Sequence, residues 1–587
     1  MQPNVGMGER TKMTRWGMLL AVLVIGCDAS RGGEPVALRL AEGVTAEELA
    51  ARVARFEPAS IDFDDSVLES WERAVLAKLV DASQLMHEIF AAQVSPQNAA
   101  WSAGLAKMEG PAGEAARDYF DIMVGPWDRL EHDAPFLDVG PKPPGAGYYP
   151  ADLTKEEFDA WMAAHPADKE AFEGYFTVIR REGQNLVAVP YARAYGAVLE
   201  RAAALLTEAA ELSQNASLSD YLRKRAAAFR SNDYFESDLA WMDIDSRIEP
   251  TIGPYEVYED ALLGYKAAFE SFVTIEDASA SAELQMLKDW LPRLEQALPI
   301  EERYRNPDRA FESPIRVVDV VFTAGDTRAG VQTTAFNLPN DVRVHEQKGS
   351  KKVMLRNVSQ AKFDKILLPI ARLVLAPELA GDVAFQPWFT NVVMHELAHG
   401  LGPGTITLPS GETTTVNRAL RDHYSALEEL KADVTGLHNL TVLAAHGVYP
   451  DAFVRAAWIG HLADLFRAVR FGTSEAHGRA NLMQFNWLRA KGALVPVESR
   501  DGASPAGARQ SGTFRANLDA VIEANRALAT EVLTIQATGD YEGAAAFVRS
   551  WGTAGTDLEA ALARLTDVPV DIRPRYTVLE KRNGWTP

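Results

Sequence analysis

The sequence His-Glu-Leu-Ala-His at 395–399 is an H-E-x-x-H motif in a segment with helical character. On a helix, positions i and i+4 lie on one face, so His395 and His399 can direct ring nitrogens at one metal ion. Glu396 lies beside them, where a carboxylate can accept the proton of a water molecule activated at the metal. With 11 histidines in 587 residues, a chance motif is expected in roughly one such chain in a hundred. The motif predicts a metal-dependent hydrolytic centre.

A third ligand is expected from an acidic segment downstream. Zinc in catalytic centres usually has three protein ligands and one open position. Glu429 and Asp433 are four residues apart in a segment whose apolar residues recur at helical spacing, so both carboxylates share a face. Glu429 would bind one Zn²⁺ per chain with the two histidines, and Asp433 would hydrogen-bond the back of a ligating imidazole. Glu428 competes for the ligand role, and without the upstream motif these acidic residues would be interpreted as a solvated helix face.

Composition and charge restrict the possible classes of protein. A chain of 587 residues is too long for one ordinary core, so two or more lobes are expected. The content of 47% hydrophobic and 24% charged residues is typical of a globular protein. The net charge of −22 disfavours nucleic acid as a partner and adsorption to an acidic membrane surface.

The N-terminus resembles a bacterial lipoprotein signal. Arg10, Lys12 and Arg15 precede a short apolar stretch, 16–26, which ends at Cys27, the only cysteine in the chain. We therefore predict a signal peptide over 1–26, lipidation at Cys27 and a flexible tether over 27–44. The protein would then lie in the cell envelope, facing the periplasm or the cell surface, with membrane contact only through its lipid. The alternatives are an ordinary signal peptide and an uncleaved anchor.

Secondary structure is predicted to change along the chain. Helical periodicity extends from about 45 to 240, with a Gly- and Pro-rich interruption over 125–150. A β-branched run over 315–322 predicts a strand, and Pro-Ser-Gly at 409–411 predicts a β-hairpin between the two metal-binding segments. The remainder is predicted to be helical, with a possible strand near 568–579.

Several separated segments resemble the dipeptidyl peptidase III family of zinc exopeptidases, and in particular the branch fused to Nudix domains in plants. Glu-Glu-Leu-Lys-Ala-Asp at 428–433 is similar to the family's E-E-x-x-A-[ED]. The H-E-x-x-H motif and the predicted hairpin after it are also similar to segments of the family. Three further segments resemble it: Phe336–Asp341, which is like the family's N-x-P-N, Ile252–Asp260, which is like its I-G-x-x-E-x-Y, and Glu475–Arg479, which is like the segment with a late catalytic histidine. The best-known members carry H-E-x-x-G-H, whereas this chain has the shorter box, which suits a regular helix. No Nudix box is visible.

The resemblance implies an α+β fold with two lobes around a wide cleft. One lobe would be mostly helical and bear zinc, and the other would be mixed with a β-barrel core. An N-terminal helical region, 45–275, would lead into the mixed lobe, and 276–345 would form the strand-rich part of that lobe and the cleft. The helical, zinc-binding catalytic lobe would follow over 346–540. A C-terminal segment, 541–587, would return to the mixed lobe.

The resemblance also implies roles for residues outside the metal motifs. Glu256 and Asn337 would hold the free N-terminus of a short peptide, and Asn340 would bind its backbone. Tyr258 and His477 would hydrogen-bond the scissile carbonyl oxygen. Dipeptides would then be released from peptide N-termini. The alternatives are a zinc endopeptidase or amidase on the same site, and an inactive peptide-binding surface lipoprotein. Taken alone, the Asn-Leu-Pro-Asn segment would be interpreted as a turn.

Overall fold

The computed structural model describes residues 38–306, 314–470, 472–473, 475–498 and 510–585. The predicted signal peptide, the lipidation site Cys27 and the tether up to residue 37 lie outside the described residues. Within the part that is described, no helix combines the length and the apolar character needed to cross a bilayer.

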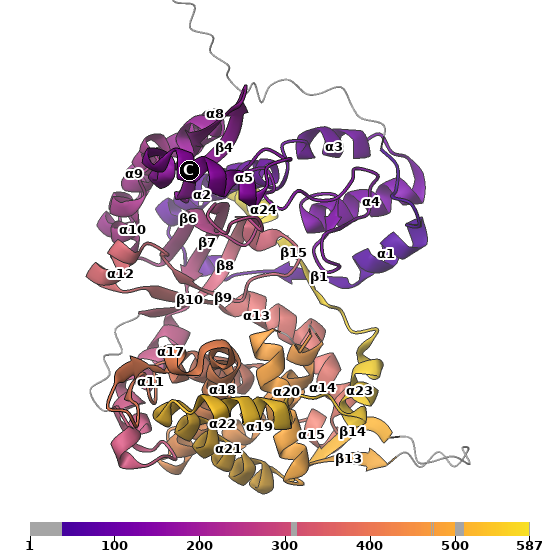
Figure 1. The fold of residues 1–587 in the computed structure, drawn as a ribbon, viewed down its shortest axis with the longest axis vertical. Helices are drawn as coiled ribbons and strands as arrows, with labels where there is room; N and C mark the ends of the chain where they lie inside the picture. Colours follow the sequence, from indigo (N-terminus) through magenta and orange to yellow (C-terminus); the bar gives the residue numbers. More distant parts are fainter. Residues whose placement is uncertain (1–37, 307–313, 471, 474, 499–509, 586–587) are drawn as a thin grey trace, which may run out of the picture.

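The chain forms two lobes, a mixed lobe at the top of Figure 1 and a helical lobe below it. The mixed lobe contains a five-stranded sheet whose strands follow the spatial order β6-β7-β8-β10-β9. These strands are β6 Ile248–Glu256, β7 Ala268–Glu276, β8 Ile315–Gly325, β9 Ala335–Leu338 and β10 Lys351–Leu355. Helix α2 packs on β7 and β8, and α8 packs between α2 and α9. The helices of this lobe include α1 Ala46–Ala54, α2 Ser70–Val94, α3 Asn98–Leu105, α4 Gly110–Met123, α5 Lys155–Ala164, α8 Gly196–Leu212, α9 Ala216–Ser231, α10 Phe235–Met242 and α12 Val342–Lys348.

Strands β6 and β7 follow the helical periodicity predicted for about 45–240, and neither was predicted as a strand from the sequence. Eight of the nine residues of each strand are buried, so neither shows the alternation that marks a half-exposed strand. Pro250, Gly253 and Pro254 further weaken the strand pattern of β6, and they are tolerated because β6 is an edge strand. The hairpin β4 Thr177–Glu182 and β5 Asn185–Pro190 was also not predicted.

A β-barrel core is not confirmed, because the sheet is open among the described residues, with β6 and β9 as its two edges. A side chain nevertheless joins these edges. The amide nitrogen of Asn340, just beyond β9, donates to the backbone oxygen of Tyr255 in β6 at 2.9 Å. The sheet is therefore curled so that its two edges approach each other at this end without forming a closed ladder.

The helical lobe is built around α16 Phe385–Ala398 and α18 Tyr424–Ala445. Helix α16 packs on α18 and α19, and α18 packs on α20 and α21. The other helices of this lobe include α11 Ala278–Gln296, α14 Leu368–Val374, α15 Pro377–Ala380, α17 Val416–Leu420, α19 Asp451–Val469, α20 Ala476–Ala490, α21 Leu518–Thr538, α22 Tyr541–Trp551 and α23 Thr556–Leu562. Helix α13 Arg356–Lys362 lies between the lobes and packs on β8 and on β1 Phe56–Ile61 of the mixed lobe. The predicted hairpin is confirmed as β11 Thr405–Thr407 and β12 Thr413–Thr415.

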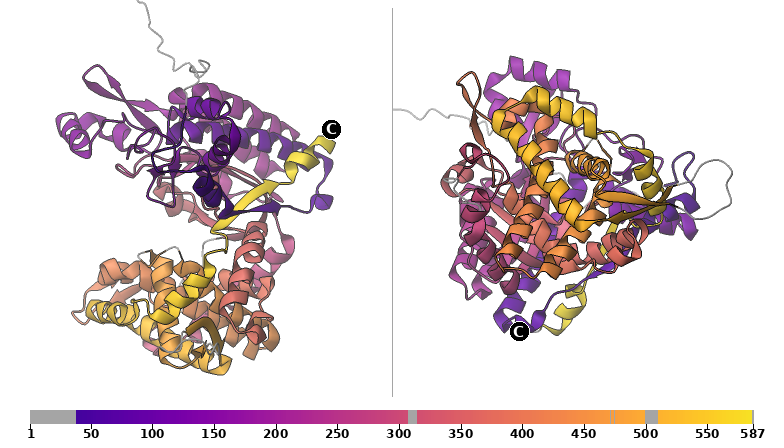
Figure 2. Two further views of the ribbon diagram at one scale, coloured as in Figure 1. Left: turned by 90° about the vertical axis from the view of Figure 1, so that its right-hand side faces the viewer. Right: turned by 90° about the horizontal axis from the view of Figure 1, so that it is seen from below.

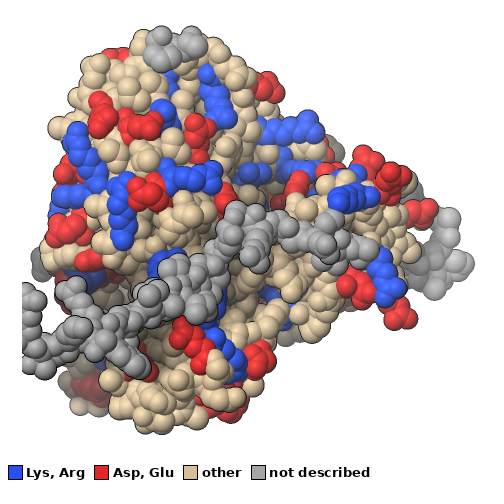
Figure 3. Space-filling view, turned by 90° about the horizontal axis from the view of Figure 1, so that it is seen from above, with Lys and Arg blue, Asp and Glu red and all other residues tan. Residues whose placement is uncertain are grey.

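The chain passes between the lobes several times, so the lobes are not continuous in sequence. Helix α11, which begins the segment 276–345 assigned to the mixed lobe, lies in the helical lobe (Figure 1). Near the C-terminus, the predicted strand is confirmed as β15 Asp571–Tyr576, which pairs in parallel with β1 Phe56–Ile61 in the mixed lobe. Figure 2 shows this strand running up from the helical lobe. On the top face in Figure 3, cationic and anionic side chains are intermixed.

Candidate metal centre

The two histidines of the H-E-x-x-H motif lie at the C-terminal end of α16. The helix ends at Ala398, and His399 is its C-cap residue but keeps right-handed helical φ and ψ angles. Because the helical repeat is retained, the two Nε2 atoms lie 3.2 Å apart. The prediction that both imidazoles point to one place is confirmed by this distance.

Helix α18 brings the third candidate ligand to the same point. It crosses α16 closely, since a Cβ at Gly436 would lie only 3.0 Å from the backbone nitrogen of His395. Glu429 Oε2 lies 3.2 Å from His395 Nε2 and 3.7 Å from His399 Nε2. Ligand atoms of these three residues all lie within 4.8 Å of one another. The structure thus favours Glu429 over Glu428 as the third ligand.

Two further carboxylates occupy the backs of the imidazoles. Asp433 Oδ1 lies 2.7 Å from His395 Nδ1, and Glu428 Oε1 lies 2.9 Å from His399 Nδ1. Each carboxylate favours a proton on Nδ1, which leaves the Nε2 lone pair free to bind a cation. Asn481 on α20 donates to Asp433 Oδ2 at 3.2 Å and so holds that carboxylate in turn.

The set of converging atoms fits a zinc ion. Glu429 Oε2 is buried, and among the described residues no group donates to it with hydrogen-bond geometry, although imidazole nitrogens surround it. Two imidazole nitrogens and one carboxylate oxygen form the usual ligand set of catalytic zinc. Burial lowers the pKa of His395, but Asp433 and Glu429 outweigh it and raise that pKa to about 10. The surrounding carboxylates therefore favour a positive charge at this point.

His477 approaches the same carboxylate from α20. Its Nε2 atom lies 3.1 Å from Glu429 Oε2, and its Nδ1 atom lies 3.0 Å from Glu475, the N-cap residue of α20. Glu429, and then Glu475, raise the pKa of His477 to about 9 against the effect of burial. The imidazole is 59% exposed. The structure places His477 at the metal centre, while its predicted contact with a substrate carbonyl stays a prediction.

Lys431 is a component of the centre that we did not predict. Its buried ammonium donates to the backbone oxygens of Ala398 and Leu401 at 2.9 and 3.2 Å, and it pairs with Glu428 Oε1 at 2.8 Å. It therefore ties the unsatisfied carbonyls at the end of α16 to the carboxylate that orients His399. Its position three residues after Glu428 was the only local signal of this role.

The candidate base Glu396 contacts a residue of the other lobe. Its Oε2 atom forms an ion pair with Nζ of Lys352, which lies on β10 of the mixed lobe. Burial raises the pKa of Glu396, but Lys352 and His395 outweigh it, and the net shift is downward. Glu396 is therefore ionised, as a proton acceptor must be.

The four residues predicted to bind peptide lie on the mixed lobe. Glu256 ends β6 and is half-buried, and its pKa is raised by burial against the opposing hydrogen bond from Asn340. Asn337 lies exposed on β9, and Tyr258 follows β6 with 82% of its surface exposed. Among the described residues, no hydrogen bond or ion pair joins these four side chains to His395 or Glu429.

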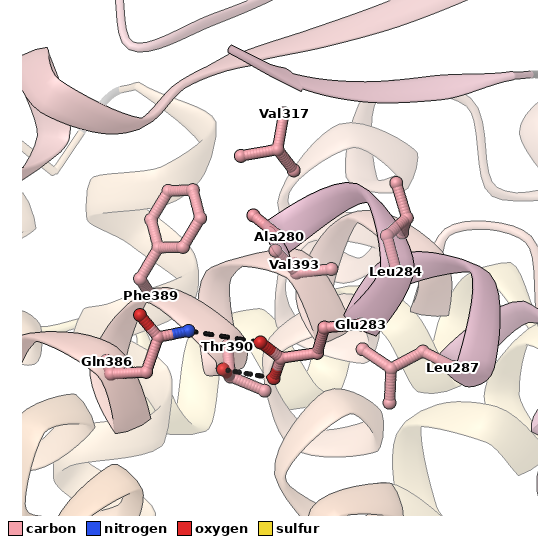
Figure 4. A pocket seen from close by; sticks show the side chains of 9 residues that line it. All are labelled: Ala280, Glu283, Leu284, Leu287, Val317, Gln386, Phe389, Thr390 and Val393. Carbon is pink, nitrogen blue, oxygen red and sulfur yellow. Dashed lines mark hydrogen bonds between the residues drawn. The ribbon is translucent and has the colours of Figure 1, made fainter. Parts of the chain in front are cut away.

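A small pocket lies on the opposite side of α16 from the ligands. Figure 4 shows Glu283 of α11 accepting hydrogen bonds from Gln386 and Thr390 of α16, each at 3.1 Å. Tyr449 donates to the same carboxylate at 2.7 Å. Apolar side chains complete the lining, among them Leu284 and Phe389. This carboxylate fixes the position of the metal-bearing helix against α11 and does not reach the metal centre.

Two lobes with this histidine and carboxylate set at the end of a helix define a metallopeptidase. The sequence pattern of Peptidase family M49 matches residues 147–436. The chain is 36% identical over 587 residues to “Nudix hydrolase 3” of Arabidopsis thaliana, covering 91% of this chain and 74% of that protein. This chain belongs to peptidase family M49.

Solved structures support the same assignment. The structure of DPP III from Caldithrix abyssi is similar with a TM-score of 0.85 and 46% identity, over 91% of this chain and 100% of that one. Dipeptidyl-peptidase III from Corallococcus sp. strain EGB is similar with a TM-score of 0.74 and 39% identity, over 92% and 98% of the two chains. The resemblance to the dipeptidyl peptidase III family is confirmed, and the chain is a peptidase.

Proposed function

We propose that this protein is a zinc-dependent exopeptidase that releases dipeptides from the N-termini of short peptides. The observation that carries the proposal is the convergence of His395 Nε2, His399 Nε2 and Glu429 Oε2, with both Nδ1 atoms held by carboxylates. Zinc, when bound by these three residues, would supply a Lewis acid that acidifies a water and polarises the scissile carbonyl.

The remaining steps are assigned to side chains of the chain itself. Glu396 accepts the proton of the attacking water and delivers it to the leaving amine, since it is ionised and adjoins the ligand set. His477, held at the centre by α20, and Tyr258, exposed on the mixed lobe, donate hydrogen bonds to the carbonyl oxygen as negative charge develops there.

The peptide N-terminus is assigned to the mixed lobe. The half-buried carboxylate of Glu256 suits a cationic ammonium group, and the exposed amide of Asn337 suits a peptide group. Asn340 donates to the Tyr255 backbone oxygen, so it holds the two edges of the sheet together beside the residues assigned to the peptide. A free N-terminus held here limits how far the peptide can advance toward Glu396.

The proposal is tested by metal analysis combined with a dipeptidyl-arylamide assay. The wild-type protein should bind about one zinc per chain and release the dipeptide. Glu396→Gln should keep the metal and the fold but lose about 10²–10⁴-fold in turnover, because the proton acceptor is gone. Turnover near the wild-type value in this variant would remove Glu396 from the mechanism.

We also propose that the protein is anchored in the cell envelope through Cys27. The basic residues and apolar stretch that precede this single cysteine support the proposal. Cys27→Ala should abolish labelling by a fatty acid and move the protein out of the detergent phase in phase separation. Unchanged partitioning would favour a plain hydrophobic anchor instead.

A further inference from the structure

Lys352 is the residue through which the mixed lobe touches the candidate base. Its Nζ atom pairs with Glu396 Oε2, and the two side chains are only 21% and 19% exposed. Lys352 lies on β10, at the lower border of the mixed lobe in Figure 1, whereas Glu396 lies on α16 of the helical lobe. The contact therefore joins the two lobes at a point where catalysis is assigned.

The same strand pair carries a residue assigned to the peptide N-terminus. In the antiparallel ladder of β9 and β10, Lys352 lies directly opposite Asn337. Directly opposed residues of an antiparallel pair project from the same face of the sheet, so Lys352 and Asn337 share a face. One rigid pair of strands thus presents the peptide-binding amide and, beside it, the ammonium that contacts Glu396.

The preceding residue, Lys351, does not point toward the helical lobe as Lys352 does. Successive residues of a strand point to opposite faces. Lys351 is buried and contacts Glu249 Oε1 at 2.6 Å and the backbone oxygen of Trp241 at 2.8 Å, all within the mixed lobe. Lys351 has a structural partner inside its own lobe, whereas Lys352 reaches across to the other.

An exopeptidase with its two functions on separate lobes must control the distance between them. An extended peptide advances about 3.3 Å per residue, so a shift of that size moves the next peptide bond to the base. A flexible arrangement of the lobes would let the first, second or third bond reach Glu396. A direct contact between the peptide-binding strands and the base restricts this freedom.

We propose that Lys352 is a positioning residue that determines the length of the released fragment. By pairing with Glu396, it places the base at a defined distance from Asn337 on β9, so that the second peptide bond is cleaved. The inference rests on the proposed dipeptide-releasing function and adds to it a residue that sets its specificity.

The test compares product lengths in Lys352→Met, Lys352→Gln and Lys352→Arg. Each zinc-loaded variant is incubated with an oligoalanine peptide bearing a free N-terminus, and the first-cleavage products are measured by mass spectrometry. The share of products other than dipeptides should rise about 3–10-fold in the Met and Gln variants, since a partly exposed ion pair contributes modestly. Lys352→Arg should restore wild-type lengths, and zinc content should be unchanged in all three.

Lys365→Met is the matched control. Lys365 pairs with Glu57 of β1 at 3.0 Å, and both side chains are 41% exposed. Glu57 lies in the mixed lobe, but neither residue lies on an element that carries a site residue. This variant should keep the wild-type product lengths. An equal shift in the control would show that any loosened ion pair alters the products and would overturn the proposal.

The other outcomes are also decisive. Wild-type product lengths in both Lys352→Met and Lys352→Gln would overturn the inference and leave the exopeptidase function intact. Loss of all activity in both, with zinc retained, would also overturn it, because a residue that only positions the base is not essential for the chemistry. Failure of the wild-type protein to release dipeptides would instead contradict the proposed function itself.

Discussion

The candidate metal-binding set of the helical lobe and the candidate peptide-binding set of the mixed lobe are organised in opposite ways. The Nδ1 atom of each imidazole in the first set lies 2.7 or 2.9 Å from a carboxylate oxygen. On the mixed lobe, Tyr258 is 82% exposed and Asn337 is exposed on an edge strand. The imidazoles of the first set are held by other side chains, whereas Tyr258 and Asn337 of the second set face solvent.

The difference follows from burial. Charged groups removed from water must be paired or bound to metal, so the sequence has to supply partners for every member of the metal set. Exposed amides and hydroxyls remain hydrated and need no fixed partner until a peptide replaces the water. The fold therefore fixes the side chains of the candidate metal centre before substrate binds, whereas the side chains assigned to the peptide gain their partners only when the peptide binds. Lys352 connects the two lobes through its contact with Glu396.

The strongest test of this comparison removes one carboxylate from the metal set. Glu429→Ala should reduce bound zinc from about one per chain to near zero, because two histidines rarely hold zinc tightly. Glu428→Ala should weaken zinc only about 10–100-fold, since it removes a partner of His399 and not a ligand. Zinc titration against a chelator measures both, and the reverse order would show that the wrong carboxylate has been assigned.

A smaller loss of zinc is expected from Lys431→Met. The change leaves the carbonyls at the end of α16 and the carboxylate of Glu428 without their buried cation. Zinc affinity should fall about tenfold, and the free energy of unfolding should fall by about 3–5 kcal/mol, measured by urea denaturation. Lys431→Arg keeps the charge and serves as the control. Unchanged zinc affinity in the Met variant would remove Lys431 from the organisation of the centre.

The pH dependence of zinc binding should be about tenfold per unit. Burial lowers the pKa of His395, but its carboxylate partners outweigh this and raise it to about 10 without metal. His395 then carries a proton throughout the range from about pH 6 to pH 8, and zinc must displace it. Affinity should therefore fall as the pH falls. Calorimetry in buffers of different ionisation enthalpy counts the released protons, and a count of zero would contradict the assignment.

Changes on the mixed lobe should leave the metal untouched. Tyr258→Phe should keep wild-type zinc affinity, since Tyr258 has no described contact with the ligands, and lower kcat by roughly 10²-fold through loss of a donor to the carbonyl oxygen. The measurement is zinc titration alongside steady-state kinetics. A change in zinc affinity as large as that of Glu428→Ala would show that the two sets are not independent.

The sequence was most informative where the chemistry is local. The H-E-x-x-H helix, the acidic helix, the hairpin after the motif and strands β8 and β15 were all predicted, because spacing along one element determines them. Strands β6 and β7 were missed because almost every residue is buried, which removes the alternation that signals a strand.

The long-range partners could not be read from local patterns. Lys352 meets Glu396 across two lobes, and Lys431 meets carbonyls of a different helix, so neither contact has a signature within one element. The open sheet could not be predicted from local patterns either, because closure of a barrel depends on how the two edge strands meet. The prediction of a barrel came from the family resemblance alone. Tertiary contacts of this kind decide how the centre is held, while the ligand types remain visible in the sequence.

The most direct test of the central claim is the cleavage of one peptide with a free and with an acetylated N-terminus, followed by mass spectrometry. Acetylation removes the ammonium and leaves Glu256 unpaired, a loss of about 2–5 kcal/mol for a buried charge pair. The free peptide should yield N-terminal dipeptides, and kcat/KM for the acetylated form should be roughly 30-fold to several thousand-fold lower. Glu256→Gln should narrow this gap by weakening only the free peptide. Equal cleavage of both forms, or internal cleavage, would contradict the exopeptidase account and favour an endopeptidase at the same metal centre.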